Sequence, residues 1–130
     1  MADTIYETIG GRLRIKAAVE LFYQKVFADP NVRHFFEGVD VQGLHARQSM
    51  FVSMLLGGKI VYTGKDIGAA HANSRRKGMN ETHFNIILRH FRAALEEIGI
   101  ETDKVVKIMT LLEGTRESVL GRKEPGRNDA

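Results

Sequence analysis

Two polar side chains interrupt apolar helical stripes in this sequence, and they are the first candidates for chemistry. Tyr23 lies inside the apolar stripe of residues 12–27, and Gln48 falls in the middle of the stripe that contains Leu44 and Phe51. A buried amide or phenol is costly unless it is hydrogen-bonded. Each side chain therefore either bonds a neighbouring backbone group, or both supply the few polar groups of an apolar ligand pocket.

The histidines include one candidate metal ligand. His71 stands one helical turn after Ile67, and the residues between them (68–70) are glycine and alanines that let a flat group approach closely. A surface or structural role for this histidine remains the alternative. His83 and His90 have no Asp or Glu at ligand spacing, so surface or structural roles are favoured for both.

The composition excludes several classes of chemistry. The chain of 130 residues has no cysteine, which excludes disulfides, thiol nucleophiles, cysteine-bound zinc and iron–sulfur clusters. No serine lies in a GxSxG motif, and the glycine pairs are helix breaks rather than a phosphate loop. Neither nucleophilic catalysis nor nucleotide binding is indicated.

Charge and hydropathy limit the partners. The net charge of +3 is dispersed, and the basic run 75–77 is short and has no interleaved aromatic residues, so we expect no nucleic acid partner. No apolar run has the length of a membrane span, and the N-terminus has no signal-like apolar core. The sequence therefore predicts a cytoplasmic protein without a membrane partner.

The spacing of apolar residues and helix breakers predicts an all-α domain. We expect one domain over residues 1–120 and a polar, mobile tail over 121–130. Helices are predicted over 12–27, from Asp40 to 56, over 67–76, from Asn80 to 98, and from 101 or 102 towards Val119, with a short piece that ends at Phe36 and a loop over 59–66.

The order of these features resembles the group I truncated haemoglobins. The motifs that carry the resemblance are Ile5–Gly11, Phe22-Tyr23, Phe35-Phe36, Leu44-xxx-Gln48-xx-Phe51, Gly57-Gly58, Tyr62-Thr63-Gly64, Ala70-His71 and Asn80–Phe84. Each motif is weak alone, but their conjunction is specific and covers about residues 4–120. The resemblance implies a two-over-two helical sandwich around a haem.

The resemblance also implies roles for individual residues. His71 becomes the proximal ligand of the haem iron, and Tyr23 and Gln48 become the distal phenol and amide. Arg47 would reach a haem propionate. Further residues would line the haem: Phe22, Phe36, Leu44, Phe51, Ile67, Met79, Phe84, Ile87 and Leu112.

Hydrogen bonding fits these roles. Bound O₂ takes partial negative charge, which a donor in a dry pocket stabilises. We expect Tyr23 to donate to O₂, and Gln48 to accept from Tyr23 and to donate to the ligand. His45 lies about 75° from the centre of its helical stripe, so we predict a five-coordinate ferrous iron.

The sequence departs from the family pattern at four points. Leu44 stands where many relatives carry a distal polar residue, and Val52, beside the tunnel residue Phe51, is smaller than a frequent aromatic at that place. The stretch 73–78 is longer than in several relatives. No histidine follows His90, so we expect haem b without the covalent histidine link of some cyanobacterial relatives.

The function implied by the resemblance is reversible binding of O₂, NO and CO at iron, in a monomer or weak dimer. One form of this function is nitric oxide dioxygenation, which needs an external reductase because the chain has no flavin or NAD site. The alternatives are O₂ or NO sensing or storage without turnover, and a helical interaction module without a cofactor.

Overall fold

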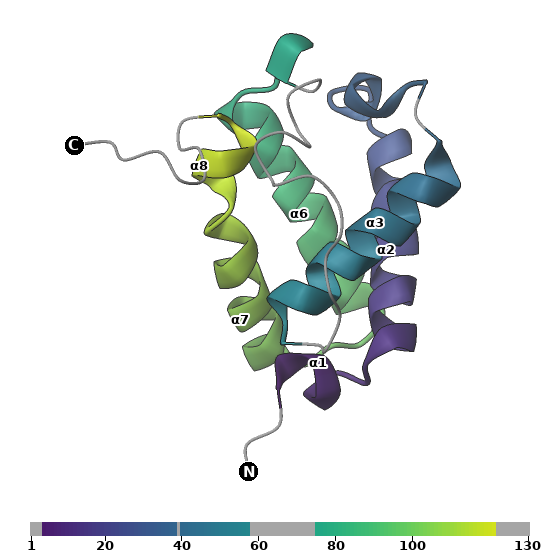
Figure 1. Cartoon of the computed structure of the whole chain (residues 1–130), viewed down its shortest axis with the longest axis vertical. Coiled ribbons are helices and arrows are strands. Elements are labelled where there is room, and N and C mark those ends of the chain that lie inside the picture. Colours follow the sequence, from purple (N-terminus) through teal and green to yellow (C-terminus); the bar gives the residue numbers. More distant parts are fainter. Residues whose placement is uncertain (1–3, 39, 58–74, 122–130) are drawn as a thin grey trace, which may run out of the picture.

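The computed structural model describes residues 4–38, 40–57 and 75–121, and the regular structure in these ranges is helical. In chain order the elements are α1 (Ile5–Thr8), α2 (Arg12–Phe27), the 3₁₀ helix η1 (Arg33–Phe36), α3 (Val41–Leu55), α6 (Glu81–Glu97), α7 (Thr102–Glu113) and α8 (Arg116–Val119) (Figure 1). The all-α prediction is confirmed, and α2 has the predicted bounds. The predicted helix 67–76 lies outside the described residues except for its last two positions.

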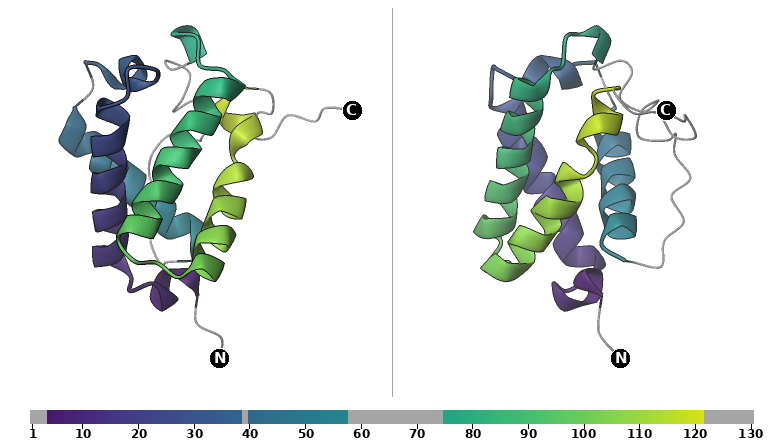
Figure 2. Two further views of the ribbon diagram at one scale, coloured as in Figure 1. Left: turned by 180° about the vertical axis from the view of Figure 1, so that it is seen from behind. Right: turned by 90° about the vertical axis from the view of Figure 1, so that its left-hand side faces the viewer.

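The four long helices form two pairs. α3 lies across α2, α7 runs beside α6, and contacts between α2 and α6 join the pairs (Figures 1 and 2). This is the two-over-two arrangement that the resemblance predicted. None of the helices in the described ranges is long and apolar enough to cross a membrane.

The core lies mainly among α2, α6 and α7. Val19 and Val26 on α2 and Ile108 on α7 are fully buried, as their helical spacing predicts. On α3, by contrast, the buried residues are only Val52 and Ser53. Several apolar side chains of α3 are therefore covered only in part.

Local hydrogen bonds explain where the helices begin and end. The Asn80 side chain accepts from the backbone N–H of His83, and the His83 ring accepts from the backbone N–H of Asn80, which is a capping box for α6. The last predicted helix is interrupted between α7 and α8. There the Thr115 hydroxyl donates to the Leu112 carbonyl over 2.6 Å. This side-chain hydrogen bond engages a backbone carbonyl in the last turn of α7.

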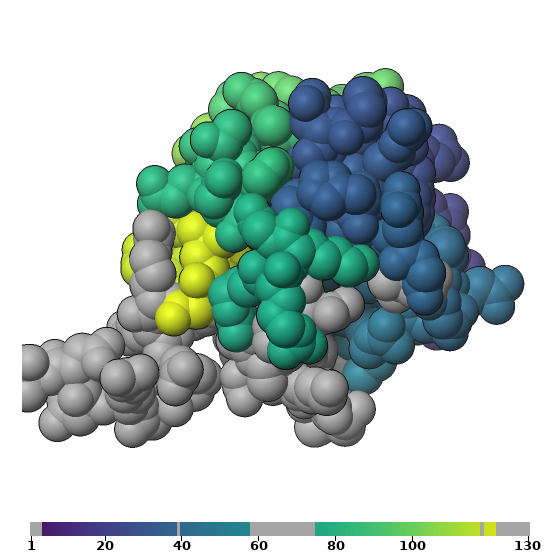
Figure 3. Space-filling view, turned by 90° about the horizontal axis from the view of Figure 1, so that it is seen from above, coloured from purple at the N-terminus to yellow at the C-terminus, as the bar shows by residue number. Residues whose placement is uncertain are grey.

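η1 and the start of α6 meet at one end of the molecule. Figure 3, which looks onto that end, shows the blue η1 region beside the teal segment that precedes α6. The Phe35 and His83 ring centroids are 4.8 Å apart, and the Lys77 ammonium donates to the His34 carbonyl. These contacts position Phe36, at the end of η1, beside α2.

Candidate functional site

Tyr23 is the centre of an aromatic cluster between α2 and its neighbours. Only 2% of the residue is exposed. Its ring centroid lies 4.8 Å from that of Phe22, 5.8 Å from Phe36 and 6.2 Å from Phe27. The helical stripe of α2 places Phe22 and Tyr23 in the interior, and η1 brings Phe36 to them. The structure thus brings Phe22, Tyr23 and Phe36 together, and their role in lining a haem stays a prediction.

The Tyr23 phenol is held in its neutral form. Burial raises its pKa far above the ordinary value because the phenolate would lose its hydration, and the positive charge of Arg47 opposes that rise only in part. Within the described residues the Tyr23 hydroxyl makes no hydrogen bond, so the alternative of a core tyrosine bonded to backbone is not what the structure has there. A buried, neutral donor is therefore available.

Gln48 and Tyr23 do not form the hydrogen bond that the sequence analysis expects. Gln48 is half-buried on α3, and no hydrogen bond joins it to Tyr23, although both residues lie in the described ranges. The α3 side chain that contacts the phenol ring is His45 instead, with ring centroids 4.8 Å apart and planes 15° from parallel. The two side chains are therefore not paired in this structure.

The contact of His45 with Tyr23 is not predicted by the position of His45 about 75° from the centre of the apolar stripe of α3. α2 passes on that side of α3, and Tyr23 stacks on the His45 ring. The Nε2 atom of His45 is buried and has no hydrogen-bond partner among the described residues. The sequence shows only that a histidine is adjacent to Leu44. It does not reveal where α2 crosses α3.

The apolar residues predicted to line a haem gather in one cluster. Phe22, Met79, Phe84 and Leu112 are buried in the core. Those packed against it and only partly buried come from η1, α3 and α6: Phe36, Leu44, Phe51 and Ile87. Arg47 is exposed on α3. Half-covered aromatic and aliphatic side chains around a neutral phenol are what a flat, largely apolar group such as haem requires.

Two predicted residues, Ile67 and the iron ligand His71, lie outside the described residues. Within the ranges 4–38, 40–57 and 75–121 no group of three His, Cys, Asp or Glu side chains could hold a metal ion. The assignment of His71 therefore stays a prediction. His90, for which a surface or structural role was favoured, pairs through Nε2 with the Asp29 carboxylate over 2.7 Å.

Comparisons with known proteins agree with this fold. The bacterial-like globin family model matches residues 4–120. A group 1 truncated hemoglobin of Tetrahymena pyriformis is 41% identical over 122 residues, which cover 92% of this chain and 97% of the relative.

Solved structures of similar proteins extend the comparison. Crystal structures of truncated hemoglobin from Tetrahymena pyriformis, including variants of one tyrosine and two glutamines, match with TM-scores of 0.84 to 0.85, 37–38% identity and coverage of 91% of this chain and 98% of theirs. The 2/2 hemoglobin from Synechococcus sp. PCC 7002, crystallised with covalently attached heme, matches with a TM-score of 0.88 and 30% identity over 92% of this chain and all of that one.

Proposed function

This chain belongs to the bacterial-like globin family and to its group 1 truncated haemoglobins, and we propose that it binds O₂, NO and CO reversibly at the iron of a non-covalently held haem b. Membership of the globin family implies a haem cofactor. The non-covalent mode is supported by the sequence, in which no histidine follows His90. We further propose that the function resides in a single domain within residues 1–120.

The state of the Tyr23 phenol carries this proposal. Haem supplies an iron with one position open to a diatomic gas. The chain supplies a buried, neutral phenol whose hydroxyl makes no hydrogen bond with another described residue, in a wall of half-covered apolar side chains. Tyr23 donates a hydrogen bond to O₂, whose partial negative charge makes that bond stronger than one to CO.

The distal residues of this chain correspond in spacing to positions varied in the Tetrahymena protein. The tyrosine and the two glutamines substituted in its crystal structures have the same separations as Tyr23, Leu44 and Gln48 have here. One of the two amides is thus a leucine in this chain. We infer that Gln48 is the one distal amide, and that Leu44 lines the site without bonding the gas.

Absorption spectra of the ferric, ferrous and ferrous–CO protein test the proposal. We expect a strong Soret band, a five-coordinate ferrous spectrum and a clear shift when CO is added. Protein purified from haem-sufficient cells without a Soret band would instead favour the cofactor-free interaction module. A six-coordinate low-spin ferrous spectrum that disappears in His45→Ala would show that His45 binds the iron.

Nitric oxide dioxygenation is the enzymatic form of this function. In this reaction O₂, NO and one electron give nitrate, and the electron must come from an external reductase because the sequence has no flavin or NAD site. A donor that retains O₂ favours it because O₂ then stays long enough to meet NO. Stoichiometric NO consumption by the oxygenated protein, with nitrate as product, is the expected result. Release of unreacted O₂ would favour sensing or storage.

A further inference from the structure

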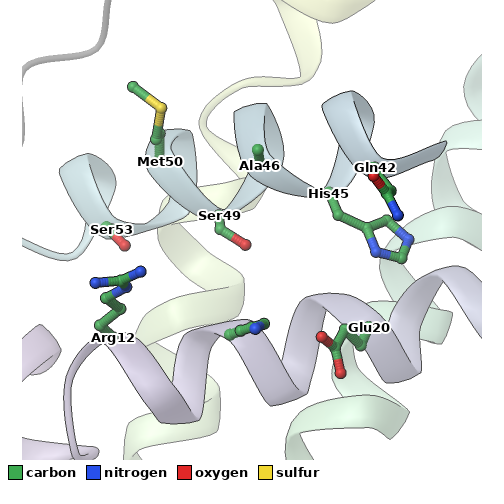
Figure 4. A pocket seen from close by; sticks show the side chains of 9 residues that line it. Arg12, Glu20, Gln42, His45, Ala46, Ser49, Met50 and Ser53 are labelled. Atoms are coloured by element: carbon green, nitrogen blue, oxygen red, sulfur yellow. The ribbon is translucent and has the colours of Figure 1, made fainter. Parts of the chain in front are cut away.

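A cavity of about 650 Å³ opens between α2 and α3, and nothing in the proposed function uses it (Figure 4). From α2 it is lined by Arg12, Lys16 and Glu20, which are one helical turn apart and therefore share a face. From α3 the lining residues are Gln42, His45, Ala46, Ser49, Met50 and Ser53. The cavity therefore runs along both helices, with Arg12 at one end, Lys16 near the middle and the Glu20 carboxylate at the other end.

Two serine hydroxyls of α3 face this cavity without partners. Only 3% of Ser53 is exposed, yet within the described residues neither its hydroxyl nor that of Ser49 makes a hydrogen bond. Figure 4 shows both hydroxyls pointing from α3 into the space between the helices. Neither hydroxyl is among the fully buried, unpartnered polar atoms of the described residues, so both can be reached from the cavity and can donate to a polar occupant.

The two cations of α2 are also unpaired. Within the described residues neither Arg12 nor Lys16 forms an ion pair, even though Glu20 follows Lys16 by one turn. Arg12 is the first residue of α2, where the helix dipole disfavours positive charge. In Figure 4 its guanidinium extends towards Ser53. A bound anion would offset this unfavourable placement.

We propose that this cavity, a groove between α2 and α3, binds a small organic phosphate ester. Arg12, Lys16, Ser49 and Ser53 provide hydrogen-bond donors on both walls, from the Arg12 end to the middle of the cavity. A phosphate offers them three terminal oxygens, whereas a carboxylate offers two.

The organic part of the ester extends towards Glu20, Gln42 and His45. Arg12 and Glu20 are eight residues apart, which is about 12 Å along a helix, so the cavity is longer than inorganic phosphate. The Glu20 carboxylate repels a second anionic group at that end. The body of the ligand is therefore neutral or cationic, and it contacts the His45 ring.

Binding to the purified protein at low ionic strength tests this site. Phenyl phosphate, inorganic phosphate and benzoate are titrated while calorimetry, the NMR signals of the His45 ring and the absorption spectrum are recorded. We expect saturable binding of phenyl phosphate at one site, tighter than either comparison compound, with a shift of the His45 signals. An unchanged absorption spectrum excludes binding at iron, so this test does not depend on the proposed function.

Single substitutions locate the phosphate. Arg12→Gln and Lys16→Gln should each weaken binding about three- to tenfold, and Ser53→Ala about two- to tenfold. Lys107→Gln, which removes the same charge from an exposed position on α7, is the matched control and should change nothing. Glu20→Gln should strengthen binding of phenyl phosphate.

Three results would overturn the proposal. They are the absence of saturable phenyl phosphate binding, equal effects of Arg12→Gln, Lys16→Gln and Lys107→Gln, and benzoate binding as tight as that of phenyl phosphate. The first removes the site, the second places any anion elsewhere, and the third contradicts the choice of phosphate.

Discussion

α3 and α6 are of similar length, 15 and 17 residues, but they are stabilised differently. α6 begins with a capping box at Asn80, and two ion pairs, Lys25–Glu97 and Asp29–His90, join it to α2 or the residues just after it. α3 begins at Asp40, whose side chain makes no capping hydrogen bond, and no ion pair in the described ranges joins α3 to α2. α2 and the residues just after it therefore hold α6 by packing and ion pairs, whereas α2 holds α3 mainly by packing.

The burial of the two helices differs in the same direction. α6 buries Phe84, Phe91, Ala94 and Leu95, whereas α3 buries only Val52 and Ser53. α6 is thus stabilised by the protein's own core. α3 has an incompletely covered apolar side near Tyr23 and a polar side along the groove. Both ligands proposed above, the haem and the phosphate ester, lie against α3. Helices that bind ligands commonly come from the less stable part of a fold.

The largest expected effect comes from His71→Ala. This substitution removes the proposed bond between protein and iron, so we expect haem to be lost or retained only with added imidazole. Amide hydrogen exchange in α3 should then accelerate more than that in α6, because α6 buries more of its side chains in the protein's own core. Haem content and absorption spectra, with exchange followed by mass spectrometry, provide the measurement. Normal haem content with an unchanged ferrous spectrum would contradict the assignment.

The second prediction compares the same substitution in the two helices. Leu95→Ala in α6 should cost about 2–5 kcal/mol of unfolding free energy with or without haem, because Leu95 is buried by protein atoms. Leu44→Ala in α3 should cost clearly less in haem-free protein, where Leu44 is only partly covered, and more once haem is added. Denaturant unfolding of both forms measures these costs. Equal costs for Leu44→Ala in both forms would show that haem does not contact this residue.

Much of the fold was predictable because local signals agreed with the packing. The apolar spacing of residues 12–27 and the turn at Pro30 specify α2, and Asn80 followed by His83 specifies the start of α6. The sequence does not predict the interruption after α7. The apolar spacing of Ile108 and Leu112 extends past residues 114 and 115 to the buried Val119. That interruption depends on the hydroxyl of Thr115 bonding the chain three residues earlier, which apolar spacing does not report.

The sequence indicates which residues are candidates for the site, but it does not predict their contacts. Tyr23 and Gln48 were identified because polar residues interrupt apolar stripes, and Tyr23 is indeed buried. The stacking of His45 on Tyr23 and the groove beside it depend on how α3 crosses α2. A helical wheel describes one helix at a time and cannot provide that crossing.

The third prediction tests the apolar side of α3. Tyr23→Phe should speed O₂ dissociation about 10- to 150-fold, since a hydrogen bond to a charged group contributes about 1.5–3 kcal/mol. The CO dissociation rate should hardly change. Gln48→Leu should act in the same direction but more weakly, and rapid mixing measures both gases on all variants.

The double variant Tyr23→Phe, Gln48→Leu distinguishes two arrangements of the distal side. If the amide orients the phenol, the double variant changes the free energy of O₂ dissociation by less than the sum of the two single variants. The structure has no hydrogen bond between these side chains, so this arrangement requires the amide to move when the gas binds. Additive effects would indicate two independent contacts. Equal acceleration of O₂ and CO would instead indicate altered access.

The fourth prediction compares the two helix starts. Asn80→Ala removes the side chain that accepts from the His83 N–H, and it should cost about 1 kcal/mol of stability. Asp40→Ala removes a side chain with no such bond and should cost less. Thermal unfolding of the two variants, compared with the unsubstituted protein, measures the difference. A larger loss from Asp40→Ala would show that α3 depends on its N-terminus more than its hydrogen bonds indicate.

The smallest expected effect concerns the ion pair that joins α6 to the end of α2. The Asp29 carboxylate accepts from the Asn31 backbone N–H and from His90, and these bonds, in that order, lower its pKa below the ordinary value. An acid whose pKa is lowered by folding stabilises the protein above its unfolded pKa of about 3.9, and this stabilisation disappears as the pH falls through the folded pKa. Asp29→Asn should therefore lower stability by less than about 1 kcal/mol at pH 7, and the difference should vanish in acid.

Asp103→Asn is the control, because Asp103 is exposed and bonds its chain neighbour Lys104, a contact that the unfolded chain can also make. A loss of stability in Asp29→Asn that persists unchanged below pH 3 would mean that packing around the carboxyl group, rather than its charge, connects α2 to α6.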